Sequence, residues 1–199
     1  MFTGIIQAVG EVEALTPVGG DLRLSIATGE LPLQDVKPGD SICVSGCCLT
    51  AIAVRDAAFD ADVSKETLGL TTLGNLKLGS PVNLEKSLTL ATPLGGHLVS
   101  GHVDGLGLIK SRREDARSVR FDVQVPMTLK RYVAHKGSIS VDGVSLTVNA
   151  IYNDVFDVNI IPHTMTHTIF SGYQPGTRVN LEVDVVARYV ERMLGEQVR

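Results

Sequence analysis

The stretch Ser41-Ile-Cys-Val-Ser-Gly-Cys-Cys-Leu-Thr50 decides the fold, because the chain repeats it in altered form as Ser138-Ile-Ser-Val-Asp-Gly-Val-Ser-Leu-Thr147. The copies are 97 residues apart, and the same offset places Val82-Asn-Leu-Glu85 on Val179-Asn-Leu-Glu182. Identities occupy 16 of the 45 positions from 41 to 85, without a gap. Solenoid repeats have shorter periods, about 20–50 residues, so the offset indicates duplication of a whole domain. Two like domains predict two like pockets.

Composition narrows the class of protein. The 199 residues are 44% hydrophobic, which is enough for two small packed cores, and the net charge is −4 with no basic run. Nucleic acid is therefore not expected as a partner. No stretch reaches the ~20 apolar residues that span a bilayer, and Met1-Phe-Thr-Gly-Ile-Ile does not have the pattern of a signal peptide. Three cysteines, an odd number, suit a reducing cytoplasm.

Short apolar or alternating runs predict six strands in each copy. Gly10 predicts a bulge in the first strand, and Ser64 suits the N-cap of a short helix. Six short strands with tight turns favour a closed antiparallel barrel, because closure removes exposed edges. The expected strands cover residues 4–14, 22–26, 41–46, 49–54, 57–63 and 81–87, then 101–109, 119–125, 138–142, 146–151, 155–160 and 178–184.

The predicted fold class is all-β, with two tandem homologous six-stranded antiparallel β-barrels and a C-terminal α-helix. We expect the N-terminal barrel in residues 1–96, the C-terminal barrel in 97–184 and the helix in 185–199. In the last segment, large apolar residues recur at helical spacing outside both copies, which is typical of an interface helix. These residues are Val186, Tyr189, Val190, Met193 and Leu194.

Four motifs carry a resemblance to riboflavin synthase that covers essentially the whole chain. They are Met1-Phe-Thr-Gly-Ile, Gly46-Cys-Cys-Leu-Thr50, Gly95-Gly-His-Leu-Val-Ser-Gly-His-Val103 and Asp142-Gly-Val-Ser-Leu-Thr147. The resemblance implies that each barrel binds 6,7-dimethyl-8-ribityllumazine. It implies that a four-carbon unit passes between two such molecules, giving riboflavin and a 5-amino-6-ribitylamino-pyrimidinedione. It further implies a homotrimer without metal or redox cofactor, with active sites where the N-barrel of one subunit faces the C-barrel of its neighbour.

The chemistry is expected where the two copies differ. Cys48 corresponds to Ser145, His102 to Ile5, and Asp184 to Ser87. Unlike residues at equivalent points would let one pocket donate the four-carbon unit and the other accept it. The sequence does not decide which barrel is the donor, or which residue takes the proton.

Cysteine and histidine each allow two interpretations. Most free cysteines behave as small buried apolar residues, whereas the resemblance places Cys48 at the ligand, as a polar contact or a catalyst. Cys47 points to the opposite face of its strand and is expected in the core. Histidine is the side chain best suited to move protons near neutral pH, which makes His102 a candidate, although a structural histidine is the common alternative. His97 lies five residues away, on the opposite face of an extended strand, and is expected to be structural.

The hydroxyl and charged candidates have simpler alternatives too. Ser145 and Thr147 share one face of a strand, and such a pair is often only solvated. Asp184 can orient a base or bind ribityl hydroxyls, and it can also cap the following helix. Lys136 precedes a strand and can meet a carbonyl or an oxyanion, although exposed lysines are usually solvated.

The candidate catalytic residues are thus Cys48, His102, Ser145, Thr147 and Asp184. The resemblance adds ligand-lining segments, with Ser64, His163 and Met165 as positions where contacts are expected to vary. The complete candidate binding set is Gly4, Ile5, Ile6, Ser41, Cys48, Leu49, Thr50, Asp62, Val63, Ser64, Lys65, Glu66, Thr67, Gly101, His102, Val103, Lys136, Ser145, Leu146, Thr147, Ile160, Ile161, Pro162, His163, Thr164 and Met165.

Two rival functions remain open at this point. The first is a lumazine- or flavin-binding protein of the same fold that serves as an optical antenna, since a fold does not fix a function. The second is a duplicated flavin-reductase-type barrel, but no glycine fingerprint for a nucleotide follows a strand. Formation of riboflavin from the lumazine would separate the enzyme from both.

Overall fold

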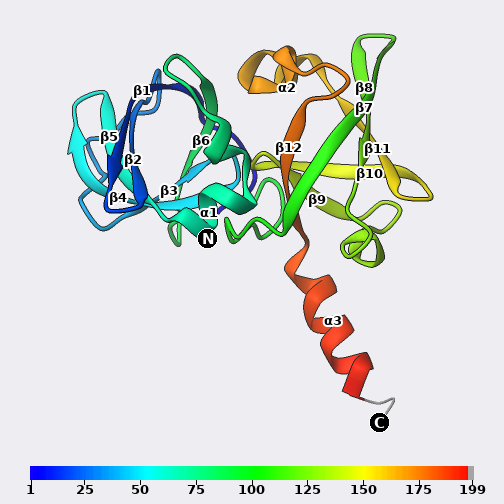
Figure 1. Cartoon of the computed structure of the whole chain (residues 1–199). Coiled ribbons are helices and arrows are strands. Elements are labelled where there is room, and N and C mark those ends of the chain that lie inside the picture. The colour runs from blue at the N-terminus through cyan, green and yellow to red at the C-terminus, as the bar shows by residue number, and fades with distance from the viewer. Residues whose placement is uncertain (197–199) are drawn as a thin grey trace.

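The computed structural model describes residues 1–196 as two closed antiparallel barrels followed by a helix (Figure 1). The N-barrel has the strand order β1-β2-β5-β4-β3-β6. Its elements are β1 Ala8–Val18, β2 Asp21–Ala27, β3 Ser41–Val44, β4 Cys47–Arg55, β5 Ala58–Val63, α1 Lys65–Leu70, the 3-10 turn η1 Thr72–Asn75 and β6 Pro81–Lys86.

The C-barrel repeats this plan with the strand order β10-β11-β8-β7-β12-β9. Its elements are β7 Gly105–Asp115, β8 Ser118–Gln124, η2 Lys130–Tyr132, β9 Ser138–Val141, β10 Val144–Tyr152, β11 Val155–Ile160, α2 Pro162–His167, η3 Ile169–Gly172 and β12 Arg178–Val183. The terminal helix α3 spans Val185–Glu196. The predicted fold class is confirmed, and residues 197–199 of the predicted helix lie outside the described range.

Side chains alternate along each strand between the barrel interior and the outside, and the inward ones form the core. In β4 the side chains of Cys47, Leu49 and Ala51 are buried, whereas Cys48 and Thr50 point outward. Phe59 in the N-barrel and Phe156 in the C-barrel, one offset apart, are both fully buried. Two separate hydrophobic cores result, one per barrel. Within residues 1–196, no helix is long and apolar enough to cross a membrane.

Two local predictions had different outcomes. The cap at Ser64 is confirmed, because its Oγ accepts the Thr67 amide at 3.2 Å. The predicted bulge at Gly10 is wrong: Gly10 pairs with Val82 in register, and the irregularity lies between Val12 and Ala14. Gly10 is needed for space instead, since a Cβ there would lie 2.5 Å from the Ala27 carbonyl oxygen.

The two barrels meet across a local two-fold axis. Phe2 and Val99, one offset apart, pair with each other through N–H to O bonds of 2.7 and 3.1 Å. Asn83 of the N-barrel donates to the Asp142 carbonyl at 2.9 Å, and its equivalent Asn180 donates to the Ser45 carbonyl at 2.7 Å. The reciprocal bonds explain why the Val-Asn-Leu-Glu motif occurs in both copies: its asparagine ties each barrel to the other.

The first residues of each copy cross to the opposite barrel. The Gly4 carbonyl accepts the amide of Ser145 at 2.7 Å, and the Gly101 carbonyl accepts the amide of Cys48 at 2.8 Å. Ile6 packs on the C-barrel core and Val103 on the N-barrel core. We call residues 2–6 and 99–103 the two arms. The arms occupy parts of the predicted strands 4–14 and 101–109, so the true strands begin later, at Ala8 and Gly105.

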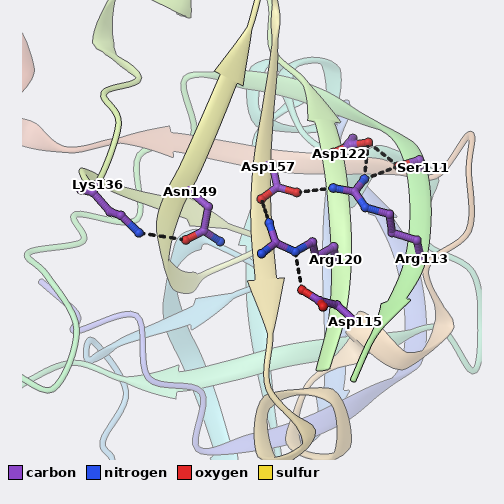
Figure 2. A network of polar contacts seen from close by, with 8 residues as sticks. All are labelled: Ser111, Arg113, Asp115, Arg120, Asp122, Lys136, Asn149 and Asp157. Atoms are coloured by element: carbon purple, nitrogen blue, oxygen red, sulfur yellow. Dashed lines mark hydrogen bonds and ion pairs between the residues drawn. The ribbon is translucent and has the colours of Figure 1, made fainter. Parts of the chain in front are cut away.

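The C-barrel carries a polar network on β7, β8 and β11 (Figure 2). Asp157 is buried and accepts from Arg113 at 2.8 Å and from Arg120 at 2.7 Å. Arg113 also reaches Asp122, and Arg120 reaches Asp115. Two guanidinium groups therefore compensate one buried carboxylate, as burial of a charge requires. The network ties neighbouring strands and lies apart from the arms.

Helix α3 extends away from both barrels (Figure 1). Polar contacts hold it to the C-barrel: Arg188 pairs with Asp104, and Glu191 accepts from Arg131 and Tyr132. The apolar stripe is left exposed, with Tyr189 at 66% and the other four residues at 49–69%. An apolar stripe of this size with no partner among the described residues is typical of an association surface.

Candidate functional site: two outward faces between crossing arms

Each barrel presents one outward face to the other half of the chain. On the N face, the strand register aligns Cys48 with Cys43 and Cys43 with Glu85, and Thr50 with Ser41 in the next row. On the C face, the equivalent rows are Ser145, Ser140 and Glu182, then Thr147 and Ser138. The predicted pair Ser145 and Thr147 therefore lies on one face, as its spacing required, and so do the equivalent Cys48 and Thr50.

The N face opens into a cavity of about 210 Å³. It brings together predicted site residues from three separate segments, because the second arm runs past the start of β4 and past helix α1. Gly101 has φ +81°, and a Cβ there would lie 2.5 Å from the Cys48 Cβ, so only glycine permits this approach. The lining residues are Cys47, Cys48, Glu66, Thr67, Leu70, Thr71, Gly101, His102 and Val103.

The C face is covered by the segment that precedes the second arm. His97 Nδ1 lies 2.7 Å from Ser145 Oγ, and a Cβ at Gly96 would lie 2.8 Å from the same oxygen. His97 is only 8% exposed. Burial lowers the pKa of His97, and the charges of Asp184 and Glu182 only partly oppose this effect. The imidazole is therefore neutral at pH 7 and can accept the Ser145 hydroxyl proton.

The premise that His97 and His102 lie on one extended strand is wrong. The segment is irregular apart from the bridge at Val99, so the spacing of the two histidines does not set their faces. His97 Nε2 is buried and has no hydrogen-bond partner among the described residues. A buried polar atom without a partner is costly.

Two buried glutamates hold the arms in place. Glu85 accepts from the Thr3 amide and hydroxyl at 2.7 and 2.6 Å and from the Gly4 amide at 3.0 Å. Glu182 accepts from the equivalent arm, including the His102 amide at 3.0 Å. Burial raises the pKa of Glu85 despite these bonds. The identity of Glu85 and Glu182 in the repeat was visible in the sequence, but their hold on the arms was not.

Several predicted binding residues have side chains or amides that are not free to bind a ligand, because they are buried in a core or bonded to a neighbour. The side chains of Leu49 and Val63 are in the N-barrel core, and those of Leu146 and Ile160 are in the C-barrel core. Others are committed locally. Asp62 forms an ion pair with Arg23 at 2.7 Å, and the Lys65 amide donates to Asp21 at 2.9 Å. The Ser64 hydroxyl caps α1.

Around the C-barrel, Lys136 adopts φ +62°, and its Nζ lies 3.5 Å from Asn149 Oδ1 (Figure 2). Asp184 caps α3, because its Oδ1 accepts the Val186 amide at 3.0 Å. Exposed Ile5 lies on the first arm, within 3.4 Å of a Cβ placed at Gly95. The start of α2 supplies the remaining predicted positions, which are the exposed Ile161, Pro162 and His163 and the half-buried Thr164 and Met165.

No metal centre is evident in the described part of the chain. Within residues 1–196, no group of three or more His, Cys, Asp or Glu side chains is placed to hold a metal ion. His163 and His167 stack with ring centroids 4.0 Å apart, but His167 Nδ1 lies 2.8 Å from the His163 carbonyl. The polar groups of the two faces are hydroxyls, amides, a thiol and imidazoles, which suit an organic ligand with many polar atoms.

Comparison with known proteins defines the class first. The family model of the lumazine binding domain matches residues 3–87 and again 100–184, so the two barrels are two copies of that domain. A solved structure of LumP complexed with riboflavin superposes with TM-score 0.83 over 92% of this chain and 99% of that chain. Its sequence identity of 24% shows a shared fold alone.

Curated relatives then specify the family. Riboflavin synthase of Mycobacterium bovis is 46% identical over 98% of this chain and 98% of its own. The Photobacterium phosphoreum enzyme is 45% identical over 98% of this chain and 89% of its own. The Bacillus subtilis enzyme is 41% identical over 98% and 90%. The chain belongs to the riboflavin synthase family.

Proposed function

We propose that this chain is a riboflavin synthase that converts two molecules of 6,7-dimethyl-8-ribityllumazine into riboflavin and a 5-amino-6-ribitylamino-pyrimidinedione by four-carbon transfer. Family membership supports the activity. The observation that carries it at the level of residues is the contact of 2.7 Å between Ser145 Oγ and His97 Nδ1, because a binding domain needs no hydroxyl–imidazole pair of this kind. The two outward faces supply one binding surface for each substrate molecule.

The reaction asks for an acidic methyl proton to leave one lumazine and for a nucleophile to add to the other. Neutral His97 can accept a proton through the Ser145 hydroxyl, and Thr147 and Asp184 stand beside this pair on the C face. General acid–base help of this kind contributes about 10²- to 10⁴-fold. Holding two oriented substrates against each other contributes more, since an intermolecular step becomes effectively unimolecular.

On the N face we assign binding to the cavity lined by Cys48, Glu66, Thr67 and the second arm. His102 can exchange a proton with the bound molecule or position it. Cys48 is proposed as a polar contact and not as a covalent catalyst. Its counterpart Ser145 lies against the imidazole of His97, whereas no imidazole within residues 1–196 is hydrogen-bonded to the Cys48 thiol.

We further propose that the working unit is a homotrimer. The exposed stripe of α3 supports it, as does the family resemblance in which the N-barrel of one subunit faces the C-barrel of the next. The cavity on the N face is lined by residues between 47 and 103, and we assign the second substrate to the C face of a neighbouring subunit. The three free cysteines suit a cytoplasmic location.

The test is to incubate purified protein with the lumazine and separate the products by chromatography. We expect riboflavin and the pyrimidinedione in equal amounts. The competing function is a non-catalytic lumazine- or flavin-binding protein. Tight binding of the lumazine without either product would establish that function in place of the enzyme, and absence of binding would overturn both.

A further inference from the structure

Cys43 and Cys48 lie directly opposite each other on β3 and β4. The hairpin between these strands turns through Ser45 and Gly46, which have φ 44° and 85°. Both positive values are typical of the two-residue turn that fixes hairpin register. The pairing of Val44 with Cys47 therefore closes the hairpin, and the next pair is Cys43 with Cys48.

The backbone bonds show which kind of pair this is. The Cys48 amide donates to the Gly101 carbonyl at 2.8 Å and not to β3. Cys43 is paired on its other side with Glu85 of β6. Cys43 and Cys48 are thus a non-hydrogen-bonded pair, in which Cα atoms are about 4.5 Å apart. That separation lies inside the range of about 4.4–6.8 Å that a disulfide spans.

The surroundings give the two sulfurs different roles. Cys48 is half-buried and lines the cavity of the N face, so a dissolved oxidant can reach it. Cys43 is buried in a small cluster with Phe2 and Val99, on the same side of the sheet as Cys48. Cys47 points into the barrel core. Adjacent strand residues face opposite ways, so Cys43 is the partner that Cys48 can reach.

We propose that Cys43 and Cys48 form a reversible cross-strand disulfide that weakens ligand binding at the N face under oxidising conditions. The C face has Ser140 and Ser145 at the equivalent positions and cannot be modified in this way. The modification would therefore act on one of the two binding surfaces only. Its effect on the ligand rests on the proposed function, whereas formation of the bond does not.

A disulfide such as oxidised glutathione can supply the oxidising equivalents. The Cys48 thiolate attacks one sulfur of the oxidant, forming a mixed disulfide and releasing a glutathione thiolate, which takes up a proton. Cys43 then gives its proton to solvent and attacks the Cys48 sulfur, releasing the second glutathione. Two protein thiols are oxidised and one glutathione disulfide is reduced. Burial raises the pKa of Cys43, so this second step should accelerate as the pH rises.

The test exposes reduced full-length protein to excess oxidised glutathione. It then alkylates the remaining thiols with N-ethylmaleimide in denaturant, where the buried cysteines are accessible, and measures the intact mass. We expect a mass lower by two hydrogen atoms, one alkylated thiol, and reversal by dithiothreitol. Cys47→Ala should still form the bond, and Cys43→Ser should stop at a glutathione adduct. Retention of three alkylatable thiols in the wild type would overturn the proposal. So would an internal disulfide in Cys43→Ser, which keeps only the vicinal pair and decides the matter even if Cys47→Ala fails to fold.

A further measurement follows riboflavin binding by fluorescence in the reduced and the oxidised protein. We expect oxidation to weaken one of two sites by about tenfold or more, the loss of roughly one good polar contact. Dithiothreitol should restore the site, and reduced Cys43→Ser should bind like the reduced wild type. Unchanged binding by the oxidised protein would overturn the effect on the N face. Absence of binding in both redox states would instead overturn the proposed function, and the thiol count would still decide the disulfide.

Discussion

The N face and the C face share one arrangement of residues and differ in what lies over them. Both have a threonine on the outward row, a glutamate that fixes an arm, and a glycine of the arm pressed on the central residue. The N face then opens into a cavity, whereas the C face is covered by Gly96 and His97. The central residue is Cys48 in one face and Ser145 in the other.

This difference shows which residues of a duplicated domain must stay identical and which can diverge. The residues that hold the barrels together, such as Asn83 and Asn180, are identical because each must satisfy the same reciprocal bonds. The residues that face a ligand are free to diverge once each copy holds its own molecule. Divergence of Cys48 and Ser145 is thus expected for two surfaces with unequal roles in one reaction.

The largest expected effect follows from the proposed trimer, in which the N face of one subunit meets the C face of its neighbour. Ending the chain after Asp184 removes α3, and each large apolar residue of its stripe gains roughly 1.5–3 kcal/mol when fully buried. We expect a smaller species in sedimentation with lumazine binding retained. Riboflavin formation should fall by about three orders of magnitude or more, because the two substrates no longer meet.

Tyr189→Glu is the matched variant, since it keeps the helix and places a charge on the stripe. It should give the same smaller species. A truncated chain that stays trimeric and fully active would show that the stripe has another purpose. If the truncated chain does not fold, the variant still tests the assembly, because its substitution lies on an exposed position.

The next effect concerns the pair found only on the C face. Ser145→Ala and His97→Ala should each lower kcat by about 10²- to 10⁴-fold, the range of general acid–base catalysis. The double variant should be little worse than either single one, because the two residues act as a unit. Ser140→Ala is the control, since its hydroxyl is buried beside Ser145 and has no partner among the described residues.

The dependence of kcat on pH distinguishes a catalytic role of His97 from a purely structural one. The pKa of His97 lies below its usual value, so the neutral, proton-accepting form is gained as pH rises through that lowered pKa. Wild-type kcat should show this acidic limb, and His97→Ala should lack it. Equal losses in kcat and in riboflavin affinity, with the limb retained, would assign the pair to ligand positioning.

A third difference lies at the contact between the barrels, where Asp142 occupies the position equivalent to Ser45. Asp142 is buried, and burial raises its pKa from 3.8 to about 7, although Tyr173 and the Asn180 amide donate to it. A raised pKa means that its contribution to stability is present below pH 3.8 and is lost as pH rises through about 7. The loss is on the order of a few kcal/mol, because each tenfold change in proton affinity corresponds to about 1.4 kcal/mol.

Urea unfolding from pH 5 to pH 8 should show this loss in the wild type and much less of it in Asp142→Asn, which stays neutral. His97 contributes with the opposite sign, because its folded pKa is lowered and its share grows with pH. Subtracting the unfolding free energy of Asp142→Asn from that of the wild type at each pH removes the contribution of His97. A difference that does not change with pH would show that Asp142 is ionised throughout at no cost.

The duplicated barrels could be predicted from the sequence because a constant offset and strand alternation are local signals. The shared face of Ser145 and Thr147 followed from the two-residue period of a strand. The crossing of the arms could not be predicted, since an alignment shows that Gly4 is equivalent to Gly101 but not which barrel each one touches. The contact of His97 with Ser145 was missed for a related reason: spacing predicts a face only where the backbone is regular.

The two faces can also be compared by weakening the bonds that hold each arm. Glu182 fixes the arm that lines the N face, and Glu85 fixes the arm that meets Ser145. Exchanging either for glutamine keeps its size and weakens charge-assisted bonds, each contributing about 1.5–3 kcal/mol. Glu182→Gln should weaken riboflavin binding at the N face by about tenfold, and Glu85→Gln at the C face. Calorimetric titration resolves the two sites, and identical effects of both variants would show that the arms act together.

The smallest expected effect is that of Cys48→Ser, which gives the N face the central residue of the C face. A polar contact survives this exchange, because the hydroxyl also donates and accepts hydrogen bonds. Turnover should therefore remain within about tenfold of the wild type, a change of about 1.4 kcal/mol or less in the barrier. A covalent role predicts otherwise, since a serine without a base is a far weaker nucleophile than a thiolate. Within residues 1–196 no imidazole is hydrogen-bonded to Cys48, in contrast to the 2.7 Å contact of Ser145 with His97. A loss beyond about a thousandfold, with riboflavin binding intact, would make Cys48 a nucleophile and would reverse the assignment of chemistry to the C face.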